Sequence, residues 1–358
     1  FSVTVRELHS FISWYGGKNK MAKKIISIMP KHKNYVEVFG GGAHILLNKK
    51  RSPLEVYNDV NFGLVSLFRT VRVKEHAQEL KRLLELTPYS REEFEYAKLM
   101  WDKGLEDNSS EFEELKNKLE QGEITQEEYD KKWRKLDMER FYKYPIKIKE
   151  KMKCLNSKMS KGEISREEYN KEFEKLEEER IKDQIERARM FYVLRMQSFS
   201  SGLQSWKFDK NNKSIGLSPC IKRYLNSISK DIDYAVERFK TVQIENMSYE
   251  YILEKYDSPE TLFYLDPPYI HDTRGESARN VYHYELEDSL HKDLVERLMK
   301  IKGKFILSGY DHQIYDPLND GKRFFKVKLD DFAKACQFTQ KGDKKDRGEE
   351  FLWINFKL

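Results

Sequence analysis

The chain has 358 residues, of which 39% are hydrophobic and 35% charged, and its formal net charge is +6. This length allows one large core or two ordinary ones, and the absence of an apolar run of about 18 residues excludes a membrane-spanning helix. The three cysteines (Cys154, Cys220 and Cys336) lie far apart, and the eight histidines show no paired ligand spacing. We therefore expect chemistry without a protein-bound metal. Because the first residues lack an apolar signal core, we also expect a reducing, cytoplasmic location.

The first seventy residues alternate between strand and helix patterns. The predicted elements are a buried strand at 35–39, a glycine turn at 40–42, a helix at 43–50 and a second strand at 54–57. A glycine turn lets a ligand approach the backbone, and Asp59 after the second strand could accept hydrogen bonds from ribose hydroxyls. Ile45 stands where a dinucleotide fingerprint needs a small residue. The pattern favours an adenosine-containing cofactor without singling out NAD, and a purely structural turn is the alternative.

Upstream of the first strand, residues 13–18 (SWYGGK) place two aromatic residues and two glycines before a lysine. Such a segment could form a turn that offers aromatic surface and an ammonium group to a ligand. An ordinary surface turn explains the same residues equally well.

The middle of the chain, from about 105 to 185, is dense in Glu and Lys and contains a repeat: 122–136 matches 162–176. The repeated features are a glycine (Gly122, Gly162) that closes one helix, a capping box (Thr125 with Glu128, Ser165 with Glu168) that opens the next, and an apolar stripe (Tyr129, Trp133 and Leu136; Tyr169, Phe173 and Leu176). We interpret the segment as an inserted pair of helical hairpins that could pack on each other. A scaffold-like decoration is favoured, and an arm that binds a protein partner, self-associates or clamps DNA is the alternative.

A basic and aromatic segment follows the insertion. Its basic residues are Arg195, Lys207, Lys210, Lys213, Lys222, Arg223 and Lys230, against one acid, Asp209, and its aromatic residues are Phe199, Trp206, Phe208 and Tyr224. Basic side chains among aromatic rings suit contacts with phosphates and bases. A solvated lysine-rich loop is the alternative.

The last third of the chain resumes the strand and helix alternation. The predicted elements are strands at 241–244, 262–265 and 305–307 and a helix at 291–300. Strands separated by helices predict a mostly parallel sheet that is covered on both faces. The strand at 262–265 ends in LDPPY (265–269), where two prolines cannot donate to a sheet ladder. Asp266 and Tyr269 therefore lie on a stiff turn at the end of a buried strand.

These segments occur in a recognisable order. They are WYGGK (14–18), YVEVFGGGAHILLNK (35–49), YNDVN (57–61), LRMQSFSSGLQSWKF (194–208), LDPPY (265–269), LSGYDHQIY (307–315) and RGEEFLWIN (347–355). Together they resemble the Dam-type (D12 class) DNA adenine-N6 methyltransferases, which use S-adenosylmethionine, over about two thirds of the chain, without the repeat. The resemblance implies an α/β fold, namely a Rossmann-like methyltransferase sheet with helices on both faces, plus a mostly helical target-recognition region. It also implies double-stranded DNA as partner and a bacterial, phage or mobile-element setting.

The resemblance also implies a division of the chain and a role for each motif. The segments are a cofactor-binding half at 1–72, a target-recognition region at 73–239 and a catalytic half at 240–358. The implied cofactor-binding residues are Trp14, Tyr15, Lys18, Glu37, Phe39, Gly40, Gly41, Gly42, Asp59 and Asp266. The implied DNA-binding residues are Arg195, Ser198, Phe199, Trp206, Lys207, Lys210 and Lys213, and the implied catalytic residues are Asp266, Pro267, Pro268 and Tyr269.

The catalytic residues suit a demanding reaction. The lone pair of the adenine amino group is delocalised into the ring, so the nitrogen is a poor nucleophile. The Asp266 side chain and the Pro267 carbonyl could accept its two N–H groups and draw it toward a pyramidal geometry, so that positioning dominates catalysis. The base must leave the duplex to reach them, and Tyr269 would stack on it. The alternative is a purely structural turn that ends the strand, with Tyr269 packed in the core.

One position departs from the family pattern. Relatives often have Asn-x-Asp before the strand that precedes LDPPY, whereas this chain has Asn246-Met247-Ser248. Ser248 cannot carry a charge, so a contact there with the cofactor adenine is in doubt.

Three other functions stay open: methylation of cytosine N4, a DNA-binding module without catalysis, and, least favoured, an NAD enzyme. The recognised DNA sequence and the existence of a cognate restriction enzyme are not determined by these residues.

Overall fold

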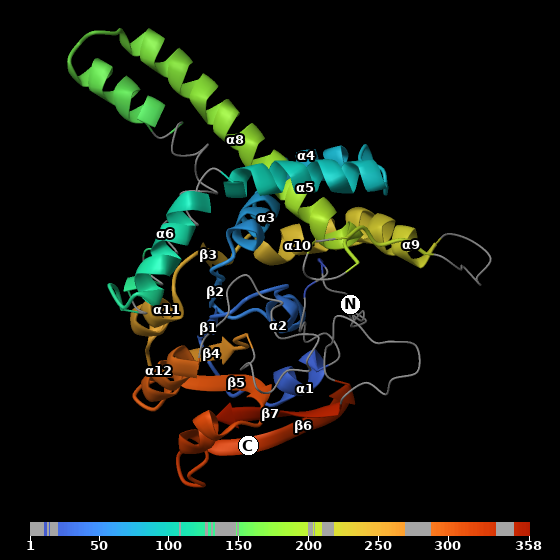
Figure 1. Cartoon of the computed structure of the whole chain (residues 1–358), viewed down its shortest axis with the longest axis vertical. Coiled ribbons are helices and arrows are strands. Elements are labelled where there is room, and N and C mark those ends of the chain that lie inside the picture. The colour runs from blue at the N-terminus through green and yellow to red at the C-terminus, as the bar shows by residue number, and fades with distance from the viewer. Residues whose placement is uncertain are drawn as a thin grey trace.

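The structure is a computed structural model that describes residues 11–12, 14, 21–106, 109–125, 128–129, 132, 148, 150–199, 203, 205–209, 218–268, 288–333 and 347–358. In this part of the chain seven strands form one sheet in the order β3-β2-β1-β4-β5-β7-β6 (Figure 1). The strands are β1 Asn34–Glu37, β2 Leu54–Asn58, β3 Gln243–Glu245, β4 Thr261–Leu265, β5 Lys304–Tyr310, β6 Phe325–Ala333 and β7 Arg347–Ile354. The first five in spatial order are parallel, and β7 and β6 add an antiparallel edge.

Helices cover both faces of the sheet, as expected for buried parallel strands. The described helices are α1 Ala22–Ser27, α2 His44–Asn48, α3 Phe62–Arg72, α4 Lys74–Glu85, α5 Arg91–Glu106, α6 Ser109–Glu120, α8 Arg166–Gln197, α9 Pro219–Asn226, α10 Ile232–Phe239, α11 Tyr249–Tyr256 and α12 Asp288–Leu298. Strand β4 shows the two faces: Leu262 and Tyr264 join the core shared with α2, α3 and α8, whereas Phe263 and Leu265 join the core under α11 and α12. This alternation is the period of a strand.

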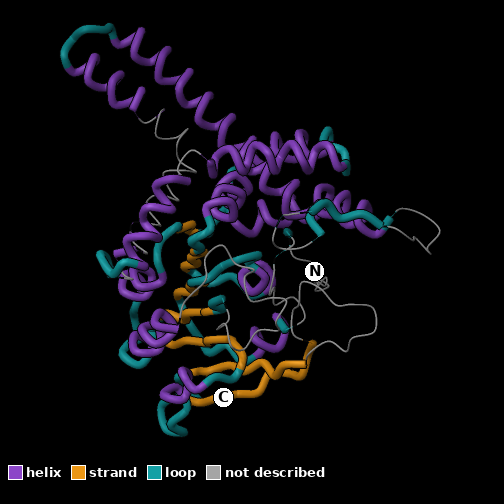
Figure 2. Tube along the Cα trace, viewed as in Figure 1, coloured by secondary structure: helices purple, strands orange, loops and turns teal. Residues whose placement is uncertain are grey.

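The sequence-based fold prediction is confirmed. The predicted strands are present, although β3 begins two residues later than expected and α2 is shorter than the range 43–50. The antiparallel pair of β6 and β7 was not predicted. Helices α3, α4, α5 and α8 pack together at the end of the molecule away from β6 and β7, and Figure 2 shows the strands confined to the other end.

The predicted hairpin features are confirmed where the structure describes them. Gly122 and Gly162 have φ of +70° and +69°, the left-handed conformation that closes a helix. Both capping boxes form: the Glu128 amide donates to Thr125 Oγ1 at 3.2 Å, and the Glu168 amide donates to Ser165 Oγ at 3.2 Å. The second hairpin joins the helical residues 150–160 to α8 and projects from the rest of the molecule (Figure 1).

The apolar stripe of this second hairpin is only partly buried. Leu176 packs with Ile148 and Leu155, and Tyr169 packs against them. Phe173 stacks on the ring of Tyr169 but is 38% exposed. Trp133 and Leu136 of the first repeat lie outside the described residues, and packing of the two hairpins on each other stays a prediction.

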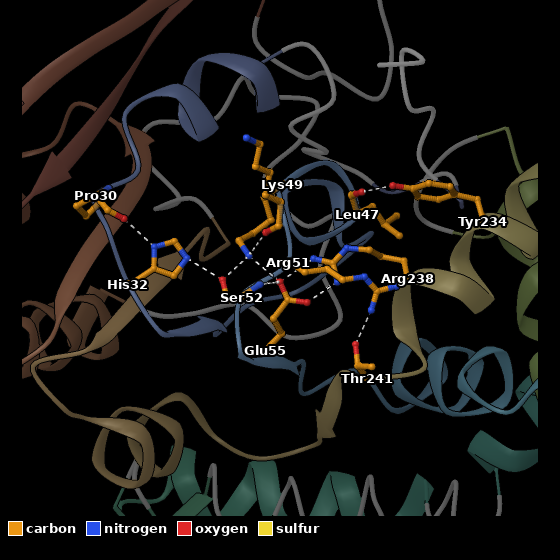
Figure 3. Close-up of polar contacts among 11 residues, drawn as sticks. Pro30, His32, Leu47, Lys49, Arg51, Ser52, Glu55, Tyr234, Arg238 and Thr241 are labelled. Atoms are coloured by element: carbon orange, nitrogen blue, oxygen red, sulfur yellow. Dashed lines mark hydrogen bonds and ion pairs between the residues drawn. The ribbon is translucent and has the colours of Figure 1, made fainter. Parts of the chain in front are cut away.

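A buried ion cluster holds the amino ends of the strands (Figure 3). Lys49 Nζ lies 2.6 Å from Glu55 Oε1, and Arg238 of α10 binds both oxygens of Glu55. These side chains are 2 to 4% exposed. Burial alone would raise the pKa of the Glu55 carboxyl, but hydrogen bonds from Arg238 and Lys49 outweigh it and lower that pKa. The cluster therefore joins the end of α2, the start of β2 and α10 through one ionised carboxylate.

We predict that Glu55→Gln lowers the free energy of unfolding by about 3–5 kcal/mol, because it leaves two buried cations without their counter-charge. Urea unfolding at neutral pH measures the loss. Since the pKa of Glu55 is lowered in the folded protein, its contribution is present above the ordinary carboxyl pKa and disappears as the pH falls through the folded value. Glu79→Gln removes an exposed partner of Arg82 and serves as control, with an expected loss below about 1 kcal/mol. Equal losses for the two variants would contradict the prediction.

Candidate active site

The direction in which the strands follow one another reverses between β1 and β4. The chain leaves β1 toward β2 on one side, whereas β4 lies on the other side. In open parallel sheets such a reversal leaves room for ligands beyond the carboxyl ends of the strands. Gly40–Gly42 follow β1 at this edge, Asp59 follows β2 and Asp266 follows β4. The topology thus places the predicted glycine turn and both predicted acids at the same edge of the sheet.

The glycine turn is packed closely by aromatic side chains of the protein. A Cβ atom on Gly40 would lie 2.2 Å from the Tyr57 ring, and one on Gly41 would lie 2.8 Å from the indole of Trp14. Gly41 also has φ of +49°, and the Tyr57 hydroxyl donates to its carbonyl at 2.8 Å. The Tyr57 and Trp14 rings therefore leave no room for a side chain at Gly40 or Gly41, and the indole of Trp14 lies against the turn.

Asp59 is fixed against the glycine turn. Its Oδ2 accepts a hydrogen bond from the Gly41 amide at 2.8 Å, and its Oδ1 accepts one from the Asn61 amide at 2.7 Å. Although part of the residue reaches solvent, the carboxyl group is surrounded by protein atoms. This burial raises the pKa of Asp59 to about 6, against the two amides and the positive charge of Arg195. At neutral pH the group is mostly ionised and accepts hydrogen bonds.

Glu37 lies beneath this edge as the last residue of β1. It is 1% exposed, and burial raises its pKa well above the ordinary value, more strongly than the Leu46 amide and nearby cations lower it. The charge of Asp266 raises the pKa of Glu37 further. Burial thus favours the neutral form of the Glu37 carboxyl. Among the described residues its Oε2 has no hydrogen-bond partner.

Asp266 is oriented by a serine that the sequence reasoning did not single out. Ser308 Oγ donates to Asp266 Oδ1 at 2.9 Å, and the Tyr264 hydroxyl lies 3.3 Å from the same Oγ. The parallel register explains the contact. Leu265 pairs with Leu307, and the residues that follow them in the chain are Asp266 and Ser308. Ser308 is fully buried. The available signal was its position one residue past an apolar strand, within the LSGYDHQIY segment.

Other predicted site residues have different surroundings. Phe39 packs against Tyr249 with 5.9 Å between ring centroids, on the face covered by α11 and α12. Ser248 caps α11 by accepting a hydrogen bond from the Tyr251 amide at 3.4 Å, so its hydroxyl serves the helix. Pro267 is buried and Pro268 half-buried. Predicted residues that lie outside the described part of the chain are Tyr15, Lys18, Tyr269, Lys210 and Lys213.

Four of the predicted recognition residues, Ser198, Phe199, Trp206 and Lys207, lie in a short antiparallel pair after α8. Ser198 and Trp206 are bridged, the Phe199 amide donates to the Ser205 carbonyl at 2.8 Å, and the Lys207 amide donates to the Gln197 carbonyl at 2.7 Å. We call residues 198–199 and 205–207 the recognition pair.

Aromatic surface lies on and beside the recognition pair. Phe199 is 56% exposed, and the rings of Trp206 and Phe208 are stacked at 5.7 Å. Arg91 of α5 lies 5.1 Å from the Trp206 ring. Arg195, which the sequence grouped with these residues, instead stacks 4.1 Å from the centroid of the Trp14 ring.

Two further observations concern the described residues. No helix in them is long and apolar enough to cross a membrane. They also contain no group of three or more acidic, His or Cys side chains that could hold a metal ion.

A doubly wound sheet with a glycine turn after β1, an acid after β2 and another acid after β4 defines a Rossmann-like methyltransferase fold. The chain belongs to the family of D12 class N6 adenine-specific DNA methyltransferases, which it matches over residues 14–330. It is also similar to the modification methylase StsI of Streptococcus sanguinis, with 33% identity over 69 residues. That match spans 19% of this chain and 10% of the relative. The family resemblance deduced from the sequence is confirmed, and the family acts on adenine rather than cytosine.

Proposed function

We propose that this protein transfers the methyl group of S-adenosylmethionine to N6 of an adenine in double-stranded DNA at a specific sequence. The observation that carries the proposal is the Asp266 carboxylate, which Ser308 orients at the same edge of the sheet as the glycine turn and Asp59. The match to a modification methylase supports a setting in which methylation marks DNA against a restriction enzyme.

The residues present fit the cofactor. An ionised carboxylate offers about four lone-pair sites, and the Gly41 and Asn61 amides use two of those on Asp59. Two acceptor sites are then available for the two ribose hydroxyls. The Trp14 indole beside Gly41 provides an aromatic face of the kind that attracts cations. S-adenosylmethionine supplies an activated methyl group on a positive sulfonium, and Tyr15, Lys18, Phe39, Gly40 and Gly42 complete the proposed pocket.

Asp266 and Pro267 would act on the target amino group. The carboxylate and the Pro267 carbonyl accept its N–H groups, which localises the lone pair on nitrogen and aims it at the methyl carbon. Methylation would make the nitrogen acidic, and the Asp266 carboxylate or water would accept the one proton that it releases. Burial raises the pKa of Glu37 beside this site, which disfavours a second negative charge next to Asp266.

Duplex DNA would bind through the recognition pair and the basic segment around it. Flipping the base leaves a gap in the stack, and exposed Phe199 with the stacked Trp206 and Phe208 offers rings for unpaired bases. Lysines of this segment would contact phosphates. The hairpin arm is proposed as a decoration of this core or as a surface for a protein partner or self-association, and a cytoplasmic location is consistent with these roles.

Asp266→Ala is expected to lower the rate of methyl transfer on the order of a thousandfold, with cofactor binding largely kept, because it removes an oriented acceptor of the amino group. Labelled cofactor is incubated with unmethylated DNA, and the DNA is digested to identify the modified base. Glu260→Ala is the control, since Glu260 is an exposed acid at the opposite end of β4. Recovery of the label in N4-methylcytosine, or full activity of the Asp266 variant, would contradict the proposed reaction.

Ser308→Ala is expected to lower kcat by roughly 10- to 100-fold while the KM for the cofactor and for DNA stays near that of the unmodified protein. The reason is that Ser308 contacts Asp266 and acts through it. Ser308→Cys, which keeps a weak donor in similar volume, should recover part of the loss. Tyr264→Phe removes the neighbouring hydroxyl without touching the Ser308–Asp266 bond and should cost less. A rise in both KM values with unchanged kcat would contradict a positioning role.

Neutralising Lys207, Lys210 and Lys213 together should weaken DNA binding and flatten its salt dependence by about 0.9 log units per lost phosphate contact. Binding isotherms at several salt concentrations measure the slope. The matched control neutralises Lys151, Lys158 and Lys161 of the hairpin arm, where we expect no change in slope. A flatter slope for the arm variant, together with an unchanged slope for the Lys207, Lys210 and Lys213 variant, would assign the DNA contact to the arm.

A further inference from the structure

Arg195 occupies a position that joins two parts of the molecule. It lies in the last turn of α8, three residues before Ser198, where the recognition pair begins. Its guanidinium carbon lies 4.1 Å from the centroid of the Trp14 ring and 5.3 Å from that of Phe191. A planar guanidinium stacks on aromatic faces in a way that an ammonium does not. Arg195 therefore packs as part of an aromatic cluster that includes Trp14.

The cluster is continuous with the proposed cofactor pocket. The Trp14 indole is in contact with the glycine turn, so closely that Gly41 cannot carry a Cβ atom. The Gly41 amide in turn donates to Asp59. A shift of the Arg195 guanidinium would therefore move Trp14 against a turn that has no spare room, and the turn holds one oxygen of Asp59.

Arg195 also acts on Asp59 through its charge. Burial raises the pKa of Asp59 to about 6, and the positive charge of Arg195 is one of the three influences that lower it. Among the described residues, the charged and titratable groups that interact with Asp59 are Arg195 from α8 and Tyr57 from β2, whose own pKa the Asp59 charge raises. Removing Arg195 would let Asp59 protonate at a higher pH, and a protonated carboxyl is a poorer acceptor for two hydroxyls.

We propose that Arg195 is a positioning residue of the cofactor pocket rather than a phosphate contact, and that it couples cofactor binding to DNA binding. The inference rests on the proposed function and specifies how its two ligands communicate. DNA held by the recognition pair fixes the last turn of α8, which fixes Arg195 over Trp14. Because such coupling is reciprocal, bound cofactor strengthens DNA binding by the same factor.

The test compares Arg195→Gln with Lys207→Gln, a second basic residue of the same segment. The affinity for S-adenosylhomocysteine, the product form of the cofactor, is measured by calorimetry with and without a duplex that the protein methylates. We expect Arg195→Gln to weaken this affinity about tenfold. In this variant the ratio of the affinities measured with and without DNA should be close to one. Its slope of DNA affinity against salt should stay unchanged. Lys207→Gln should keep the cofactor affinity and lose about 0.9 of that slope.

Two further measurements exclude a purely structural explanation. The weakening of cofactor binding at low pH should begin at a higher pH in Arg195→Gln than in the unmodified protein. Arg195→Lys keeps the charge beside Asp59 but not the planar stacking, so it should retain the original pH dependence with an intermediate affinity. This variant also serves if Arg195→Gln does not fold.

The outcomes separate the two proposals. Unchanged cofactor affinity together with a reduced salt slope in Arg195→Gln would show a phosphate contact and overturn the inference, while the proposed function would stand. Failure of the unmodified protein to bind S-adenosylhomocysteine at all would overturn the proposed function itself. Weaker cofactor binding with the DNA effect kept at full size would overturn the coupling.

Discussion

The parallel register of β2, β1, β4 and β5 is the constraint on which the site depends. Glu37 at the end of β1 pairs with Tyr57 on one side and Tyr264 on the other, and Leu265 pairs with Leu307. Four buried strands therefore reach the same edge at nearly the same level. The polar residues that follow these strands therefore lie close together. A slip of one residue in any strand would turn its side chains to the other face of the sheet.

Charge is distributed unequally between the two ends of this sheet. At the amino ends, Lys49 and Arg238 surround the single carboxylate of Glu55, which leaves one buried positive charge in excess. At the carboxyl ends, Asp59 and Asp266 are the acids of the site, and burial raises the pKa of Glu37 between them. Ionising Glu37 would add a negative charge at the edge where a carboxylate is proposed to accept an amino group. Burial therefore disfavours a further negative charge at this edge of the sheet.

The sequence located those parts of the site that depend on local signals. A buried strand that ends abruptly in glycines or prolines marks its own carboxyl end, so the turn at 40–42, Asp59 and Asp266 could be placed before the structure was known. Ser308 and Arg195 could not be, because their roles depend on neighbours far away in the chain. Arg195 is one basic residue among several in its segment, and nothing local indicates that Trp14 lies beneath its guanidinium. Ser248 was questioned for its missing charge, and the structure gives it an independent use as a helix cap.

Helix α8 belongs both to the hairpin arm and to the body of the molecule. Between 166 and 180 one residue, Leu176, is buried, whereas the second half of the helix is anchored among α3, α4 and α5 by Ile185, Ala188 and 191–194. The outer half forms the arm, and the anchored half leads into the last turn, which carries Arg195. Residues 166–180 thus add little to the core, whereas the turns that precede Arg195 are packed against α3, α4 and α5.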